Sequence, residues 1–230
     1  MKNTIKILSR LSEAFMKKRL LLVLLGIQSV VLSLIVLTYV NTILSNARIN
    51  GELDYYQIKF FYNMILVIMF ALISAYVPFF LSNSLNILYE NNIIEHMLAV
   101  KISIKDIVLA VYLRGLIYVL TLVIASFPII SISFYFGGFR FTRIIRLLVL
   151  MMAYSVFLSS VSIYISSIVK DKNVSLIIAY IVSAIIAVLN IVNMKYILNS
   201  TVITVTYLIL ALIFSLIFLA LARNTKIFNT

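Results

Sequence analysis

The 230-residue sequence contains no cysteine, one histidine, five glycines, two prolines and only seven acidic residues. Without cysteine, the chain forms neither a disulfide framework nor a thiolate metal site. No two glycines are five positions apart and followed by lysine and then serine or threonine, so the phosphate-binding loop of an ATPase is excluded. A lone histidine has no second histidine or cysteine with which to share a metal.

Charge is also scarce: charged residues make up 11% of the sequence and hydrophobic residues 64%. An ordinary soluble domain is about 25% charged and about 45–50% apolar. The polar side chains available here could not cover a water-facing surface. The composition therefore predicts a membrane protein.

Uncharged runs long enough to cross a bilayer follow one another along the chain. A membrane-spanning helix needs about 20 predominantly apolar residues. Six runs without Asp, Glu, Lys, Arg or His reach this length, at 20–44, 60–89, 115–139, 147–169, 173–194 and 196–222. We predict an all-α integral membrane protein whose single domain covers 1–230. Its six spans lie at about 20–44, 60–88, 107–136, 147–169, 173–192 and 202–222.

Lysine and arginine are distributed unevenly between the two sides that six spans create. The side that holds both termini carries thirteen of them and the opposite side six. Cytoplasmic loops are enriched in these residues. A loop with three arginines, "FRFTRIIR", opposes this orientation, but the six basic residues before the first span outweigh it because the first span usually dominates insertion. We predict a multi-pass protein of the cell membrane with both termini in the cytoplasm.

The amino-terminal residues 1–19 have the pattern of an amphipathic helix on the inner leaflet. Apolar residues fall on one face, and Lys6, Arg10 and Lys17 fall on the other. Because the basic residues of the chain are scattered among short loops, the net charge of +12 suits anionic lipid headgroups and not nucleic acid.

The longest charged passage in the interior is "LYENNIIEHMLAVKISIKDIVLAVYLRG", residues 88–115. Apolar residues recur in it at helical spacing, which predicts a short amphipathic helix at about 89–101. Ser103 followed by Asp106 has the spacing of a capping box and predicts the start of a new helix. By the charge distribution this passage is cytoplasmic. An apolar face with acids beside it suits docking to a partner protein.

The stretch "ENNIIEHMLAVKISIKDIVLA" resembles the cytoplasmic segment of type-2 ABC transporter permeases. The positions that match the family pattern are Glu90, Glu95, Met97, Leu98, Ile102, Ser103, Asp106 and 107–109. Asn92, Ile93, Lys101, Ala110 and Val111 depart from it. The layout of the whole chain is also similar to that family. The resemblance implies short re-entrant helices on the outer side in "LNIVNMKYILNST", before the last span.

The resemblance implies a permease subunit of an ATP-driven exporter. Two permease chains, identical or different, would form the pathway, and separate ABC ATPase subunits would bind ATP and dock on the cytoplasmic coupling helix. The chain itself would be no enzyme and would hold no cofactor. We expect the contact with the ATPase to involve Glu90, Ile94, Glu95, Met97, Leu98 and Lys105.

The residues also bear on the energy source. Proton-coupled transporters and voltage sensors carry ionisable groups at membrane depth, and the six uncharged runs carry none. Only Arg114 approaches the bilayer, and we expect its side chain to reach back to the inner headgroups. A partner-facing or pathway role for Arg114 is the alternative. The mostly apolar spans favour an amphipathic cargo, such as a peptide, a lipid-like molecule or a drug.

Small residues form stripes on the fourth and fifth spans, at Ser155, Ser159, Ser162, Ser166, Ala179, Ser183 and Ala187. We expect them to pack helices together, with a polar substrate track as the alternative. Pro78 and Pro128 should kink the second and third spans and free a carbonyl.

Two other functions fit the same sequence. A membrane immunity or resistance protein, or a channel-like protein, would work without an ATPase. An ATPase that copurifies with the chain would favour the exporter, whereas conduction by the purified chain alone would favour the channel.

Overall fold

The computed structural model describes residues 18–50, 55–82, 84–90, 94, 97, 99, 103–128, 130–131, 141–169, 171–199 and 201–224. These residues are almost all helical, and none of them is in a strand. The predicted interfacial helix, with Lys6, Arg10 and Lys17, lies outside the described residues, except for its last two residues, which begin the first long helix.

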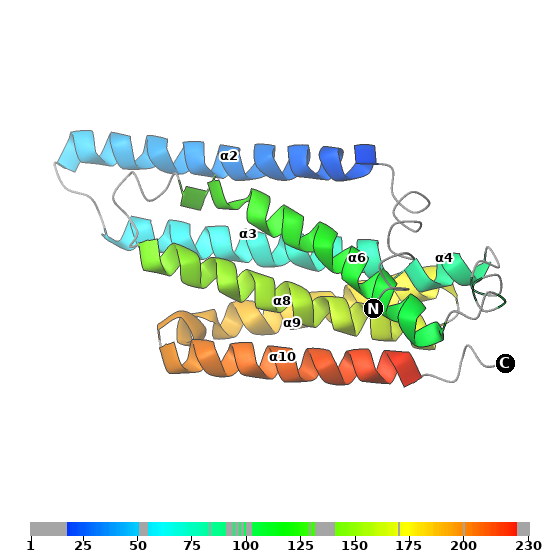
Figure 1. Cartoon of the computed structure of the whole chain (residues 1–230). Coiled ribbons are helices and arrows are strands. Elements are labelled where there is room, and N and C mark those ends of the chain that lie inside the picture. The colour runs from blue at the N-terminus through cyan, green and yellow to red at the C-terminus, as the bar shows by residue number, and fades with distance from the viewer. Residues whose placement is uncertain are drawn as a thin grey trace.

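Six long helices and one short helix make up the described chain (Figure 1). They are α2 (Lys18–Asn50), α3 (Tyr55–Leu81), the short α4 (Ser84–Glu90), α6 (Ile104–Ala125), α8 (Phe141–Ile168), α9 (Lys172–Asn199) and α10 (Thr201–Asn224). The six long helices alternate in direction along one axis, so α2, α6 and α9 begin at the end of the bundle where α4 lies. We call this the α4 end.

Five segments of the described chain are long and apolar enough to cross a membrane. They are Leu22–Thr42, Asn63–Leu88, Lys105–Ala125, Ile144–Ile168 and Lys172–Asn193. In α10 the apolar stretch Leu208–Leu221 is shorter. The described chain is thus all-helical, and its five apolar segments indicate a multi-pass membrane protein.

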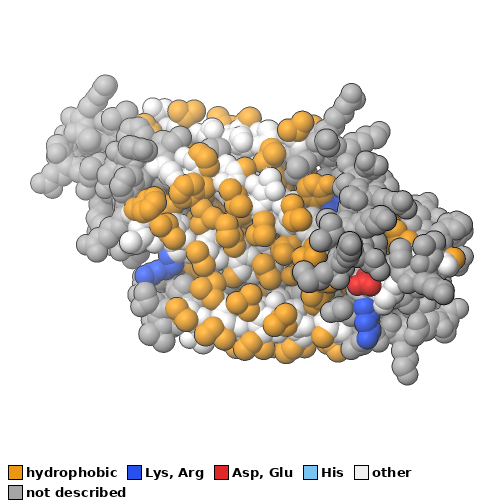
Figure 2. Space-filling view, in the orientation of Figure 1, with side chains coloured by type: hydrophobic (Ala, Val, Ile, Leu, Met, Phe, Trp, Pro, Cys, Tyr) orange, Lys and Arg blue, Asp and Glu red, His pale blue; other side chains and the backbone are white. Residues whose placement is uncertain are grey.

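The surface of the bundle is strongly apolar. On α2, α9 and α10, large hydrophobic side chains such as Leu22, Val192 and Leu216 are 65 to 70% exposed. Figure 2 shows such side chains spread over the middle of the visible face, with the described charged side chains towards its two ends. Contiguous apolar surface of this extent is unfavourable in water and suits the hydrocarbon of a bilayer.

The interior is organised around α8, which packs against α3, α6, α9 and α10, while α2 packs against α3 and α6. Tyr154 of α8 is fully buried. Its ring packs edge to face against the ring of Phe70 of α3, with the ring centroids 4.7 Å apart. Between α2 and α6, Gln28 Nε2 donates to the backbone oxygen of Leu122 at 2.9 Å. Tight aromatic packing and hydrogen bonds thus hold the helices together where lipid gives no hydrophobic driving force.

The stripes of small residues lie between helices, as the sequence predicts. All of their members are buried: Ser155, Ser159, Ser162, Ser166, Ala179, Ser183 and Ala187. Short side chains let helix backbones approach closely. Their burial agrees with a role in helix packing, and the polar substrate track stays the alternative.

Two helix boundaries differ from the predicted spans. α3 ends at Leu81, and after the turn at Ser82 the chain begins α4, so the second predicted span is divided. α6 ends at Ala125 with Ser126 as its C-cap, two residues before Pro128. A proline close behind a C-cap is common because proline cannot continue a helix. The sequence predicts a kink at Pro128, and the structure has its interruption just before it, at Ser126, with 127–128 helical again. The division after Leu81 is not predicted.

The carboxyl-terminal half also departs from the resemblance. α9 continues as one α-helix to Asn199, and α10 begins at Thr201. The residues 189–199 therefore belong to α9, and they do not form the short re-entrant helices that the family pattern implies. This segment contains no proline or glycine that would interrupt the helix.

Gly115 of α6 marks the closest approach of α6 to α3. A Cβ atom built on Gly115 would lie 2.4 Å from Leu81 Cδ2 and 2.6 Å from Leu81 Cγ. Leu81 is fully buried, so its side chain has no free space into which to move. Glycine is required here by packing, because any larger residue would push the two helices apart.

We expect Gly115→Ala to lower the free energy of unfolding by a net amount of about 1–2 kcal/mol, because the usual cost of overpacking, about 1–3 kcal/mol, outweighs a gain of about 1 kcal/mol in helix propensity. The loss would show as a lower midpoint in thermal unfolding of the detergent-purified protein, followed by circular dichroism. Gly26→Ala is the matched control, because no atom lies within 4 Å of its added Cβ. An unchanged midpoint for Gly115→Ala would contradict close packing here.

Candidate coupling site at the α4 end

The connection between α3 and α6 carries the residues that the sequence singles out. Ser82 forms the turn between α3 and α4, and both its backbone N–H and its hydroxyl donate to the backbone oxygen of Pro78, at 2.9 and 2.6 Å. α4 then packs against α8, α3 and α6 through Leu85 and Leu88, which are buried. α4 thus follows directly after α3 and remains attached to the bundle.

After α4, Ile94, Met97 and Ala99 are described, and all three are helical. Ile94 is 5% exposed and belongs to the hydrophobic core, Met97 packs against that core, and Ala99 is exposed. The helical spacing predicted for this segment agrees with this division into an inward and an outward side.

The sequence predicts that the apolar side of this segment is exposed for docking to a partner, but in the structure this side is turned towards the core. Ile94 packs inside the chain, so it is not available to touch a partner, and Met97 is only partly accessible. The reason is that the core formed by α3, α4 and α6 offers an apolar surface within reach of the segment. Of the other predicted contact residues, Glu90 ends α4, its side chain not being described, and Glu95 and Leu98 lie outside the described residues.

The start of α6 follows the predicted capping pattern. Ser103 is the N-cap with φ −72° and ψ 140°, and its hydroxyl accepts a hydrogen bond from the Lys105 backbone N–H at 3.3 Å. Asp106 lies in the first turn, where a carboxylate is favourable beside the positive end of the helix dipole. The side chain of Lys105 is exposed. The predicted helix start at Ser103 is confirmed.

Arg114 lies inside the bundle and not on its surface, with 8% of its area exposed. Its guanidinium carbon is 5.6 Å from the centre of the Tyr118 ring, one turn further along α6. The Tyr118 ring stacks in turn on Phe80 of α3, with centroids 5.8 Å apart. The buried Arg114 side chain thus lies over one face of an aromatic pair of the chain itself, while the prediction that it reaches the headgroups stays a prediction.

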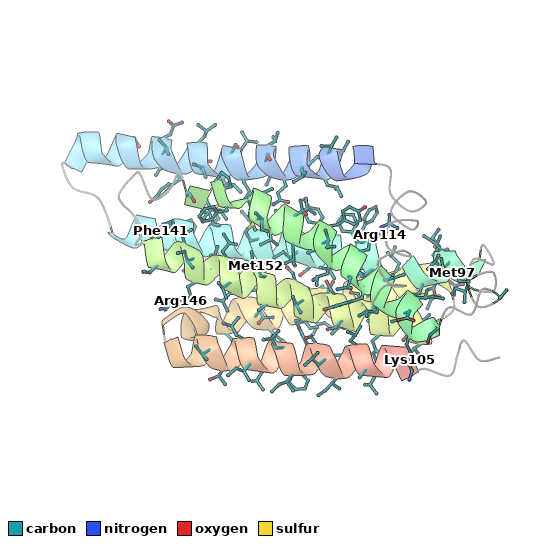
Figure 3. The ribbon with its side chains drawn as sticks, in the orientation of Figure 1. Met97, Lys105, Arg114, Phe141, Arg146 and Met152 are labelled. Atoms are coloured by element: carbon teal, nitrogen blue, oxygen red, sulfur yellow. The ribbon has the colours of Figure 1, made fainter. Side chains whose placement is uncertain are left out.

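Figure 3 shows Met97 and Lys105 at the α4 end, Arg114 further along α6, and Phe141 and Arg146 at the opposite end. Met97 belongs to the segment at about 89–101, which we call the coupling segment, and Lys105 to the start of α6. The structure thus places these two predicted contact residues at the same end. Among the described residues, no group of three or more His, Asp or Glu side chains could hold a metal ion.

A buried polar network at the crossing of α3, α8 and α9 was not identified from the sequence. The hydroxyls of Ser74 and Tyr154 are 2.7 Å apart, and Ser183 of α9 donates to the backbone oxygen of Ser74 at 3.1 Å. A signal was present, because Pro78 frees the carbonyl four residues before it, which is that of Ser74. The sequence could not show which helix supplies the donor.

Comparison with known proteins adds no relative: no family model, curated protein or solved structure matches the chain. The similarity to type-2 ABC permeases therefore rests on the residues of the coupling segment and on the layout of the helices.

The Tyr118 ring contacts Arg114 and stacks on Phe80, so replacing the ring should lower the stability of the chain. We expect Tyr118→Leu to lower the free energy of unfolding by about 1–2 kcal/mol, because it removes both the cation–π contact and the ring stacking. Tyr118→Phe keeps both faces of the ring and should change the free energy of unfolding by less than about 0.5 kcal/mol. Unfolding of the purified protein in mixed micelles measures both variants. Equal losses for Leu and Phe would show that the phenolic hydroxyl, and not the ring, matters.

Proposed function

We propose that this chain is the transmembrane permease subunit of an ATP-driven exporter similar to type-2 ABC transporters. It moves an amphipathic substrate, such as a peptide, a lipid-like molecule or a drug, with energy from separate ATPase subunits. The six long helices each cross the cell membrane, with both termini and the α4 end in the cytoplasm. A second permease chain completes the pathway.

The observation that carries this proposal is the attachment of the coupling segment to the core. Ile94 and Met97 pack against the same hydrophobic core that holds Leu85 and Leu88 of α4 and the start of α6. A segment attached in this way passes a displacement to α3 and α6, because packed interiors transmit strain and do not yield like a liquid. The outward side, represented by Ala99, is left for a partner.

The distribution of charge supports an external energy source. In the middle part of the described long helices, Arg114 is the only Asp, Glu, Lys, Arg or His residue, and it is buried beside the Tyr118 ring. Transport driven by protons would require titratable groups along a path through the spans. ATP hydrolysis by a partner that docks at the α4 end meets the same need without them.

Charge reversal at Glu95 tests the coupling role. We expect Glu95→Lys to reduce ATP hydrolysis by the complex of this chain and a coexpressed ABC ATPase about tenfold, because like charges facing each other across an interface are strongly unfavourable. Glu52→Lys makes the same charge change in the connection between α2 and α3, which joins helix ends remote from the α4 end, and should leave hydrolysis unchanged.

Equal hydrolysis by the Glu95→Lys and unmodified complexes would contradict the assignment of the coupling segment. Failure to obtain any complex with an ATPase, together with ion conduction by the purified chain, would instead favour the channel-like alternative.

The proposed orientation can be tested directly because the natural sequence has no cysteine. Single cysteines at Lys105, at the α4 end, and at Ser45, near the end of α2, replace exposed side chains at opposite ends. We expect a membrane-impermeant maleimide to label Ser45→Cys on intact cells and Lys105→Cys only after the membrane is opened. Labelling of Lys105→Cys on intact cells would reverse the orientation.

A further inference from the structure

Pro78 leaves a gap in the hydrogen bonds of α3. Proline has no backbone N–H, so the carbonyl of Ser74, four residues earlier, has no partner within its own helix. In a bilayer an unpaired carbonyl is costly because no water reaches it. The Ser183 hydroxyl of α9, 2% exposed, lies 3.1 Å from the Ser74 oxygen and donates to it.

A second hydroxyl of α9 bonds to the end of α3. The Ser175 hydroxyl, which is fully buried, donates to the backbone oxygen of Ser82 at 3.1 Å. Since α3 and α9 are antiparallel, the two bonds lie eight residues apart on both helices and flank Pro78. α9 thus holds α3 on both sides of Pro78, through Ser74 before the proline and through Ser82 at the end that leads into α4.

The Ser183 hydroxyl has a second acceptor besides the Ser74 carbonyl. Its hydroxyl carries one proton and lies near two carbonyls, that of Ser74 at 3.1 Å and that of Tyr180 in its own helix at 2.9 Å. When α3 moves away, the proton still has the Tyr180 carbonyl as acceptor, so release leaves no buried donor unpaired on α9.

The fastened state also contains unsatisfied polar atoms. Asn86 of α4 is 3% exposed, and its Nδ2 has no hydrogen-bond partner in the structure. The buried hydroxyl of Ser166 on α8 also has no hydrogen-bond partner. Buried polar atoms without partners are costly. Movement of α4 away from α8 would expose them to polar surroundings, so the fastened and released states each have their own cost.

We propose that Pro78 forms a hinge in α3 and that Ser175 and Ser183 form its latch. In the latched state both hydroxyls bond to α3. In the released state α4 and the end of α3 swing as one unit away from Ser175. The bend at the hinge also moves the Ser74 carbonyl away from Ser183, which keeps its bond to the Tyr180 carbonyl. The hinge is a property of the chain alone, so this inference goes beyond the proposed transport function and does not depend on an ATPase.

Hydrogen–deuterium exchange of the chain in lipid nanodiscs tests the latch. We expect the double variant Ser175→Ala, Ser183→Ala to exchange the amides of residues 79–90 about five- to tenfold faster, as the loss of two interhelical hydrogen bonds in a membrane implies. The matched control is Ser155→Ala, Ser167→Ala. These hydroxyls are equally buried but bond to carbonyls of their own helix, Met151 and Tyr164, each at 2.7 Å.

Pro78→Ala supplies the sharper comparison. This substitution restores the N–H that the Ser74 carbonyl lacks, so Ser183→Ala should speed exchange in the Pro78 chain and have little effect in the Pro78→Ala chain. Equal effects of Ser183→Ala in both backgrounds would overturn the hinge, and latch variants that exchange like the control would overturn the latch. Because the measurement uses the chain alone, failure of the ATPase assays leaves this test unaffected.

Discussion

The constraint on which the structure depends is that a backbone carbonyl surrounded by lipid must find its hydrogen-bond donor within the protein. Most carbonyls find this donor inside their own helix. Where Pro78 removes an N–H, the nearest available donor is a serine hydroxyl on another helix, 109 positions away in the sequence. The same requirement operates at the end of α3, where Ser175 bonds to the Ser82 oxygen. Hydroxyls on α9 therefore determine how α3 is held.

Close packing is the second requirement, because helices in lipid gain nothing from leaving water when they associate. Gly115 lets α6 lie directly against Leu81, and the serines of α8 let its neighbours approach. Leu81, against which Gly115 packs, lies three residues beyond the proposed hinge at Pro78. A tightly packed hinge is expected to have discrete positions and not a continuous range, since packed interiors resist gradual deformation.

The coupling segment and the hinge are consecutive in the chain, and this gives the proposed function a physical form. Ile94 and Met97 attach the segment to the core, α4 follows directly on the turn at Ser82, and Ser82 is one of the two latch points. A partner that pushes on the α4 end acts on the part of α3 beyond Pro78. In the proposed exporter, ATP binding would open and close this part of the helix against α9.

Patterns in the sequence were sufficient for the membrane class, the approximate positions of the helices, the N-cap of α6 at Ser103 and the inward position of the serine stripes. Each of these depends on neighbours within a few residues: a long uncharged run, a cap three residues before an acid, or a face that repeats every turn. The burial of Ile94 and Arg114, the division after Leu81 and the continuity of α9 to Asn199 were not predicted. The burial of the first two depends on other segments of the chain, as the contact of Arg114 with an aromatic stack that includes Phe80 shows. Tertiary structure alone decided which donor reaches the carbonyl freed by Pro78, because a hydrogen bond between α3 and α9 depends on how the helices pack and leaves no spacing that a single sequence reveals.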